Sequence, residues 1–250
     1  MRILVTFAVQ AEFAPWRALR EFRRMQTRGL EHFVAEVEGA EVHVLLIGIG
    51  GKKPWLAAAR AISDSKLDLA ISTGLAGGLK PEHKIGEVLV AEKVLSARRD
   101  VAARCDLSAV ETAVSLGAKR VSCFYNANHV VLSAAEKRET GGFADAVEME
   151  GFNVLAEGAM FAEKVVAIRA ISDTVEEDLP LDFNRVTTDS GEVSLARVLR
   201  QVTAAPWTVP ALLRFGRRSK SAAQELAGFL ERYVRAVVES AARLEGAGSR

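Results

Sequence analysis

Residues 146–174 read AVEMEGFNVLAEGAMFAEKVVAIRAISDT, and this stretch decides the fold class of the chain. Its pattern predicts a strand over 144–149, a helix over 150–162 and a second strand over 164–171. After Lys164, the second strand is continuously apolar apart from Arg169, which is typical of a strand buried on both faces of a parallel sheet. Strand, helix and strand in this order indicate an α/β protein.

The same alternation extends through the rest of the chain. Further strands are predicted over 2–9, 31–37, 41–48, 67–73, 86–95, 120–125 and 129–132. Further helices are predicted over 12–25, 54–64, 108–117, 133–139, 191–203 and 221–244. The strands at 31–37 and 41–48 are expected to form a hairpin around Gly39.

No repeat, low-complexity tract or linker interrupts this pattern. We therefore expect one domain over 1–250, with an extended helical C-terminal segment at about 191–245. The expected architecture is a three-layer sandwich with a mixed, largely parallel central sheet.

Composition excludes several classes of protein. Apolar residues make up 49% of the 250 residues and charged residues 26%, which is ordinary for a soluble globular protein. The net charge of +1 argues against a nucleic-acid-binding domain. No uncharged run approaches the roughly 20 residues of a membrane span, and Glu12 follows the apolar start too soon for a signal peptide. Cys105 and Cys123 form no disulfide framework, so we expect a cytoplasmic protein.

Polar or glycine-rich residues end several predicted strands. In a parallel α/β sheet, ligands bind at the carboxyl ends of the strands, so these residues are candidates for a functional site. The segments are Glu12 after the first strand, STGLAGG at 72–78, VEMEG at 147–151 and RAISDT at 169–174.

Each candidate also has a structural interpretation. Glu12 is either a general base for water or a first-turn acid that favours the helix dipole, and taken alone the second is preferred. Glu148 and Glu150 either accept hydrogen bonds from a vicinal diol or begin a solvated helix. Asp173 is either an acid or a helix cap with a structural ion pair. Arg169 interrupts a buried strand, so it needs a carboxylate or ligand partner.

The glycine-rich turns are weaker signals. STGLAGG has neither the dinucleotide-binding nor the phosphate-loop spacing. The GIGG turn at 48–51 precedes a helix, and its amides can face an anion, although a structural turn explains it at least as well.

Four of these segments, taken together, resemble the nucleoside phosphorylase and nucleosidase superfamily. Glu12 with its preceding strand, STGLAGG, VEME and RAISD match in order and spacing over roughly residues 1–175. The branch that they resemble most is the methylthioadenosine/S-adenosylhomocysteine nucleosidases. Each motif alone is modest, but four in register are fairly specific.

This resemblance implies an enzyme that cleaves the N-glycosidic bond of an adenosine-derived nucleoside. Glu12 would activate water, with Arg169 helping to hold it. Met149 would pack beneath the ribose, and Glu150 would hold the 2′- and 3′-hydroxyls. Asp173 would protonate the purine at N7. The remaining predicted substrate-binding residues are Glu148, Ser172, Leu75, Ala76, Gly77, Asn128 and Val130.

The implied chemistry needs no metal or cofactor. The four histidines, His32, His43, His83 and His129, form no spaced ligand set. Phosphate would be a co-substrate only if the enzyme is a phosphorylase. Glu12 beside the sugar favours water and would repel phosphate, so hydrolysis is preferred.

The chain departs from this branch at two places. Leu75 stands where serine is usual, and a long C-terminal tail follows Asp173. The tail segment Trp207–Arg214 resembles that of hopanoid-associated phosphorylases, which act on adenosylhopane. A futalosine hydrolase, or a non-catalytic protein that binds or stores a nucleoside, also fits the sequence.

The sequence also suggests membrane contact and association between copies of the chain. Basic residues after the apolar tail segment allow peripheral contact of 207–220 with an anionic membrane surface, although a helix packed over the core is favoured. The resemblance suggests a homodimer or larger homo-oligomer, which would use apolar surface near residues 54–64.

Overall fold

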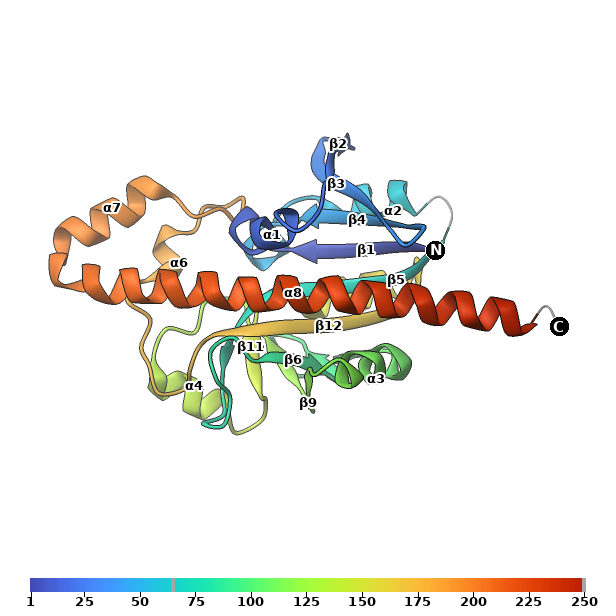
Figure 1. Ribbon diagram of the computed structural model, residues 1–250. Coiled ribbons are helices and arrows are strands. Elements are labelled where there is room, and N and C mark those ends of the chain that lie inside the picture. Colours follow the sequence, from blue (N-terminus) through green and yellow to red (C-terminus); the bar gives the residue numbers. More distant parts are fainter. Residues whose placement is uncertain (64–65, 249–250) are drawn as a thin grey trace.

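The computed structural model describes residues 1–63 and 66–248, and its centre is a mixed sheet of 12 strands (Figure 1). Three parallel strands form the middle of the sheet and are buried along most of their length. They are β1 (Arg2–Phe7), β5 (Leu67–Gly78) and β12 (Ala162–Asp173), with β5 between the other two. Parallel strands end at one edge of a sheet, so these three bring the predicted site residues to the same edge.

Beyond β1, the sheet continues through a three-stranded antiparallel unit. Its members are β4 (Ala40–Leu46), β3 (Leu30–Val37) and β2 (Arg23–Thr27), in that order from β1. The predicted hairpin is confirmed, because Val37 pairs with Ala40 and Gly39 makes the turn at a φ of +81°.

The helix predicted over 12–25 is wrong in its second half. Helix α1 spans Gln10–Arg17, and the chain then enters β2. Phe22 still packs on Phe13 and Trp16, with ring centroids 5.0 and 5.4 Å away. The aromatic spacing of three therefore arises from one cluster shared by a helix and the segment after it, not from a longer helix.

The sheet divides at the carboxyl end of β5. One branch leaves β5, where Gly77 pairs with Val147, and the other leaves β12. The first branch contains β11 (Ala146–Glu148), β10 (Phe124–Asn126), β7 (Lys93–Leu95) and β8 (Ala102–Arg104), and the second contains β6 (Val88–Ala91) and β9 (Lys119–Val121). The strand predicted over 86–95 is therefore two strands, because β6 and β7 belong to different branches. The strand predicted over 129–132 is wrong, since this segment is a loop that hydrogen-bonds to Asn184.

Helices cover the sheet and complete an α/β fold, so the predicted fold class is confirmed. They are α2 (Trp55–Ile62), α3 (Leu107–Ser115), α4 (Ala134–Thr140), α5 (Gly151–Gly158), α6 (Phe183–Val186), α7 (Leu195–Ala204) and α8 (Val209–Gly248), with 3₁₀ turns η1 (Ile49–Gly51) and η2 (Pro206–Thr208). Residue 64 of the helix predicted over 54–64 lies outside the described residues. Within 1–63 and 66–248, no helix combines the length and apolar character needed to cross a bilayer.

The apolar side of α2 faces inward. Trp55, Ala58, Ala59 and Ile62 are all buried in the core of the chain. These four residues pack within the chain, while Leu56, Ala57 and Ala61 keep some exposed surface. Association between copies near residues 54–64 stays a prediction.

Helix α8 crosses the molecule and packs on α1, α3 and β12 (Figure 1). Its buried face includes Leu226, Leu230 and Tyr233, and the Tyr233 hydroxyl donates to the carbonyl of Ala109. The helix predicted over 221–244 begins earlier, at Val209. Pro210 is compatible with this start because a proline in the first turn removes no intrahelical hydrogen bond.

Candidate active site

Three acids from separate parts of the chain line one cavity of about 790 Å³. Glu12 comes from the first turn of α1, Glu150 from the residue before α5, and Asp173 from the end of β12. Other predicted residues line the same cavity, namely Leu75, Ala76, Gly77, Val130, Glu148, Met149 and Ser172.

Backbone amides hold Glu12 in place. Its Oε1 accepts a hydrogen bond of 3.0 Å from the Leu75 amide, and its Oε2 accepts bonds of 3.1 and 3.4 Å from Ala8 and Val9. The side chain thus caps α1 and faces the cavity at once, so both interpretations of Glu12 apply. Burial raises its pKa, while the Leu75 amide and the charge of Arg169 oppose that rise.

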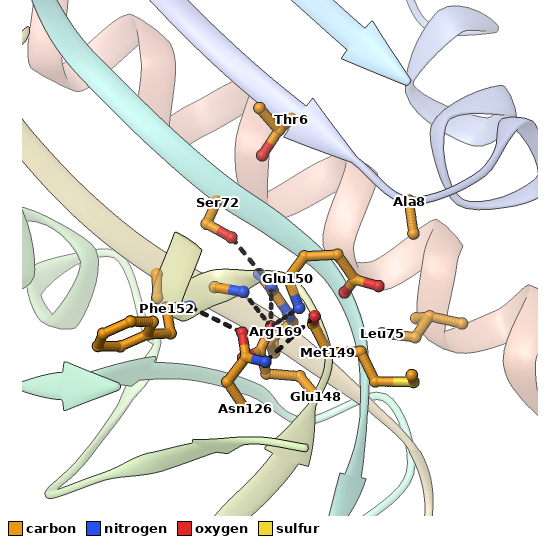
Figure 2. Close-up of polar contacts among 12 residues, drawn as sticks. Thr6, Ala8, Ser72, Leu75, Asn126, Glu148, Met149, Glu150, Phe152 and Arg169 are labelled. Carbon is orange, nitrogen blue, oxygen red and sulfur yellow. Dashed lines mark hydrogen bonds and ion pairs between the residues drawn. The ribbon is translucent and has the colours of Figure 1, made fainter. Parts of the chain in front are cut away.

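Arg169 does not hold Glu12 by a hydrogen bond, which corrects our expectation. It is completely buried, and its guanidinium donates to Glu148 at 2.5 Å and to the Ser72 hydroxyl at 2.9 Å (Figure 2). Glu148 also accepts from the Glu150 and Gly151 amides, which fixes the start of α5. Glu148 therefore lines the cavity as the internal counter-ion of Arg169, and three donors already engage its Oε2.

Glu150 is held by the turn at residues 48–51. The Gly50 amide donates to Glu150 Oε1 at 2.8 Å, so the anion that we considered for the GIGG turn is a side chain of the protein itself. Burial, followed by the negative charge of Glu148, raises the pKa of Glu150 to about 8. Because ionising this buried carboxyl group is costly, a hydroxyl donor or a positive charge beside it would strongly stabilise its ionised form.

Asp173 forms an ion pair with Lys137, a residue that we did not predict to be part of the site. Lys137 Nζ lies 2.5 Å from Asp173 Oδ2 and also donates to the carbonyls of Thr174 and Glu177. The Ser172 hydroxyl donates to Asp173 Oδ1 at 2.6 Å. The carboxyl group therefore has a donor on each oxygen and is fixed at the wall of the cavity.

The N-terminal part of the chain decides the family. Residues 2–141 match the model of the phosphorylase superfamily, which is more than half of the chain. The chain belongs to this superfamily.

Solved structures share the fold of this superfamily member. The 5′-methylthioadenosine/S-adenosylhomocysteine nucleosidase of Campylobacter jejuni has a TM-score of 0.70 at 19% identity, over 94% of this chain and 99% of that one. Futalosine hydrolase of Helicobacter pylori has a TM-score of 0.69 at 19% identity, over 94% and 97%. The Neisseria meningitidis nucleosidase, in complex with methylthio-immucillin-A, has a TM-score of 0.68 at 21% identity, over 94% and 98%. The predicted enzyme class, a nucleoside hydrolase or phosphorylase, is confirmed at the level of the superfamily.

Two site residues of this phosphorylase-superfamily chain were not predicted from the sequence. Lys137 shares the buried face of α4 with Ala134 and Thr140, and this three-residue spacing was the available signal for its burial. Asn126, at the end of β10, accepts from the Phe152 amide and donates to the Met149 carbonyl (Figure 2). It fixes the backbone on both sides of Glu150.

Asn128 lies apart from the other predicted residues. It is exposed and lines an adjoining cavity of about 610 Å³, which Lys52 and Arg98 also line. Val130 lines both cavities. The structure therefore places Val130, but not Asn128, against the cavity of the three acids.

The electrostatic character of the main cavity is acidic. Glu12, Glu150 and Asp173 line it together with Glu148, and of these Glu148 is balanced by Arg169 and Asp173 by Lys137. Lys220 also lines the cavity and, within the described residues, forms no ion pair. Among the residues that the structure describes, only backbone amides donate hydrogen bonds to Glu12 and Glu150. Such a site stabilises positive charge on a bound molecule and disfavours an anion beside these two acids.

Gly74→Ala is predicted to lower turnover by displacing Glu12. Gly74 has a φ of +145°, and a Cβ added there would lie 3.0 Å from the Glu12 carboxylate. Because small displacements of a catalytic group cost about 10²-fold in rate, we expect a loss of that order in kcat. Gly39→Ala is the matched control, since Gly39 also has a positive φ but no neighbour within 4 Å. Equal kcat values for the two variants would contradict this role of Gly74.

Proposed function

We propose that the chain hydrolyses the N-glycosidic bond of an adenosine-derived purine nucleoside. The observation that carries this proposal is that Glu12, Glu150 and Asp173 line a single cavity. Their chemistry matches the three tasks of the reaction, which are activating water, holding the ribose and neutralising the leaving base.

In this proposal, the bond between C1′ and the purine N9 breaks and its electrons pass to the base. Asp173 passes a proton to N7 and takes it from the Lys137 ammonium that contacts its Oδ2, so the base leaves as a neutral molecule. Positive charge develops on the ribose, where the Glu150 carboxylate accepts hydrogen bonds from the 2′- and 3′-hydroxyls. Water attacks C1′ and its proton passes to Glu12. The products are the free purine and the 5′-substituted ribose.

Hydrolysis is preferred to phosphorolysis for an electrostatic reason. A phosphate nucleophile at C1′ would lie in the cavity that Glu12 and Glu150 line, and negative charge on either carboxyl group opposes its binding. Arg169 offers no free cation for phosphate, because it is buried against Glu148 and Ser72. Hydrolysis is therefore the preferred reaction, and phosphorolysis, with phosphate as a co-substrate, is the alternative.

A second candidate is a nucleoside with a bulky apolar 5′ substituent, such as adenosylhopane. The cavity that the acids line continues past Leu75 to Val193, Phe183 and Phe215. These apolar side chains favour an apolar substituent because burying apolar surface provides binding free energy. For adenosylhopane, the reaction would be phosphorolysis. Hydrolysis of futalosine is a further alternative within the superfamily. A protein that binds or stores a nucleoside without catalysis is the candidate of another class.

The decisive experiment measures release of the free purine from four nucleosides. Methylthioadenosine, S-adenosylhomocysteine, futalosine and adenosylhopane are each incubated with the protein, with and without phosphate. We expect release without phosphate from at least one of them. Turnover only in the presence of phosphate contradicts hydrolysis, and no turnover of any nucleoside contradicts an enzymatic role.

The raised pKa of Glu150 predicts a pH dependence of stability. Its pKa is about 8 in the folded protein, against an ordinary value of 4.5, so the folded state binds more protons between these values. The free energy of unfolding should therefore fall as the pH rises from about 5 to 8. Chemical unfolding at several pH values tests this, with Glu150→Gln expected to show a smaller fall. An equal fall in both proteins would assign the pH dependence to other groups.

A further inference from the structure

The junction of α7 and α8 exposes large apolar side chains. Trp207 is 75% exposed, Leu195 71%, Leu199 55% and Leu213 55%. We call residues 193–220 the tail hairpin, because α7, η2 and the first turns of α8 reverse the chain here. It extends beyond the carboxyl end of β1, at the end of the molecule opposite the C-terminus (Figure 1). Single exposed apolar residues are normal, but several in one short hairpin indicate a binding surface.

The charge of this segment has one sign. Residues 193–224 contain five arginines and one lysine, and no aspartate or glutamate. Within the described residues, Arg218 pairs with Glu177, whereas Arg200, Arg214, Arg217 and Lys220 form no ion pair. The net charge of the chain is only +1, so the hairpin concentrates positive charge that the rest of the protein balances.

Apolar and basic residues are ordered along the exposed side of α8. Pro210, Leu213, Arg217 and Lys220 are exposed at helical spacings of three and four, so they lie along one side of the helix. Trp207 and Leu213 are near the tip, and the cations follow toward the body of the protein. At 1.5 Å per residue, Lys220 lies about 10 Å beyond Leu213 along the axis. Interfacial helices bury their apolar residues to about 5–10 Å, so this order would place the cations among lipid headgroups when the tip inserts.

We propose that the tail hairpin docks the protein on an anionic lipid bilayer. Trp207 and Leu213 enter the interface between headgroups and acyl chains, while Arg214 and Arg217 contact acidic headgroups. The uncompensated positive charge favours an anionic bilayer over a second copy of this chain, because the second copy would present the same charge at the same place. Trp207, Leu213 and Arg217 lie outside the cavity of the acids, although Phe215 and Lys220 of the same segment line it. The proposal concerns membrane binding alone, and it is tested without measuring turnover.

The tryptophans of the chain allow a direct test. Trp16 and Trp55 are buried and Trp207 is exposed, so a change in emission on binding reports mainly on Trp207. The full chain is mixed with phosphatidylglycerol/phosphatidylcholine vesicles and with pure phosphatidylcholine vesicles, and binding is also measured by co-sedimentation. We expect a blue shift and sedimentation with the anionic vesicles, both weakened by salt. Trp207→Phe should remove most of the blue shift and retain sedimentation.

Two further variants separate charge from apolar insertion. Arg214→Gln with Arg217→Gln should weaken binding to anionic vesicles by about thirtyfold, at roughly 1 kcal/mol per cation near the surface. Trp207→Ser with Leu213→Ser should abolish the sedimentation. The matched control is Leu107→Gln with Arg104→Gln, an exposed apolar and an exposed basic residue on α3 and β8, which should bind like the wild type.

Several outcomes would overturn the proposal. One is absence of binding to anionic vesicles at low salt, and another is equal loss in the control variant. The third is measured by sedimentation velocity. If the wild type self-associates, the Trp207→Ser/Leu213→Ser variant is monomeric and neither binds vesicles, then the tail hairpin binds a second copy of the chain and not a bilayer.

Discussion

Asp173→Asn should lower the rate of purine release by about 10²–10⁴-fold, the usual contribution of a positioned proton donor. The asparagine side chain preserves the size and the acceptor oxygen of Asp173 but cannot transfer a proton to N7. Ser172 and Lys137 fix the carboxyl group at the cavity wall, so the proposed donor does not have to be ordered during the reaction. Steady-state measurement of kcat and KM on the best nucleoside of the four tests this expectation.

The folding of this variant must be checked, because it leaves the buried ammonium of Lys137 without its carboxylate. Breaking a buried ion pair by removing one partner costs about 3–5 kcal/mol. Assays should therefore run at a temperature where circular dichroism shows the variant to be folded. A low kcat with unchanged substrate affinity supports proton transfer. Asp182→Asn, which alters the cap of α6 outside the main cavity, is the control, and unchanged turnover in Asp173→Asn would remove Asp173 as the acid.

Arg169→Met should cause a large loss of stability. It leaves Glu148, which is also fully buried at its side chain, with backbone amides but no counter-ion. The expected cost is about 3–5 kcal/mol, because the remaining charge is no longer compensated. For a chain of this size, that corresponds to a fall in Tm of roughly 6–20 °C. Thermal and chemical unfolding measure it directly.

A second substitution and an exposed pair make this test specific. Adding Glu148→Gln to Arg169→Met removes the uncompensated charge, so it should restore part of the lost stability. Arg138→Met breaks an ion pair of similar length, 2.6 Å, whose side chains are 55% and 61% exposed. This control should cost less than about 1 kcal/mol. If Arg169→Met unfolds like the control, the buried pair is not a principal support of the site.

The sequence predicted more about Asp173 than about Arg169. Asp173 follows directly from its place after a buried strand, because parallel strands carry ligands at their carboxyl ends. The sequence also showed that Arg169 needs a partner, since a buried guanidinium is costly alone. It could not name that partner. Glu12 and Glu148 were both available, and the register of β12, β5 and β11 brings Glu148 to Arg169.

The errors in the predicted helices and strands also arise because a local pattern does not show which distant residues pair. The aromatic residues at 13–22 gave a helical spacing, although Phe22 belongs to the segment after α1. The apolar run at 86–95 gave one strand, although the division of the sheet breaks it into β6 and β7. Periodicity describes which side of a segment is apolar, but pairing with distant strands decides where the segment ends.

The sequence by itself determined the alternation of strands and helices, the fold class and the positions of Glu12, Glu150 and Asp173 at the ends of elements. Local patterns suffice for these features, because strand and helix periodicities and the residue at a strand end are read within a few positions. The tertiary structure alone decided that Arg169 pairs with Glu148, that Gly50 holds Glu150 and that Lys137 is buried beside Asp173. Each of these contacts joins residues that are far apart in the chain, and only the packing of strands, turns and helices in the folded protein brings their atoms within hydrogen-bonding distance.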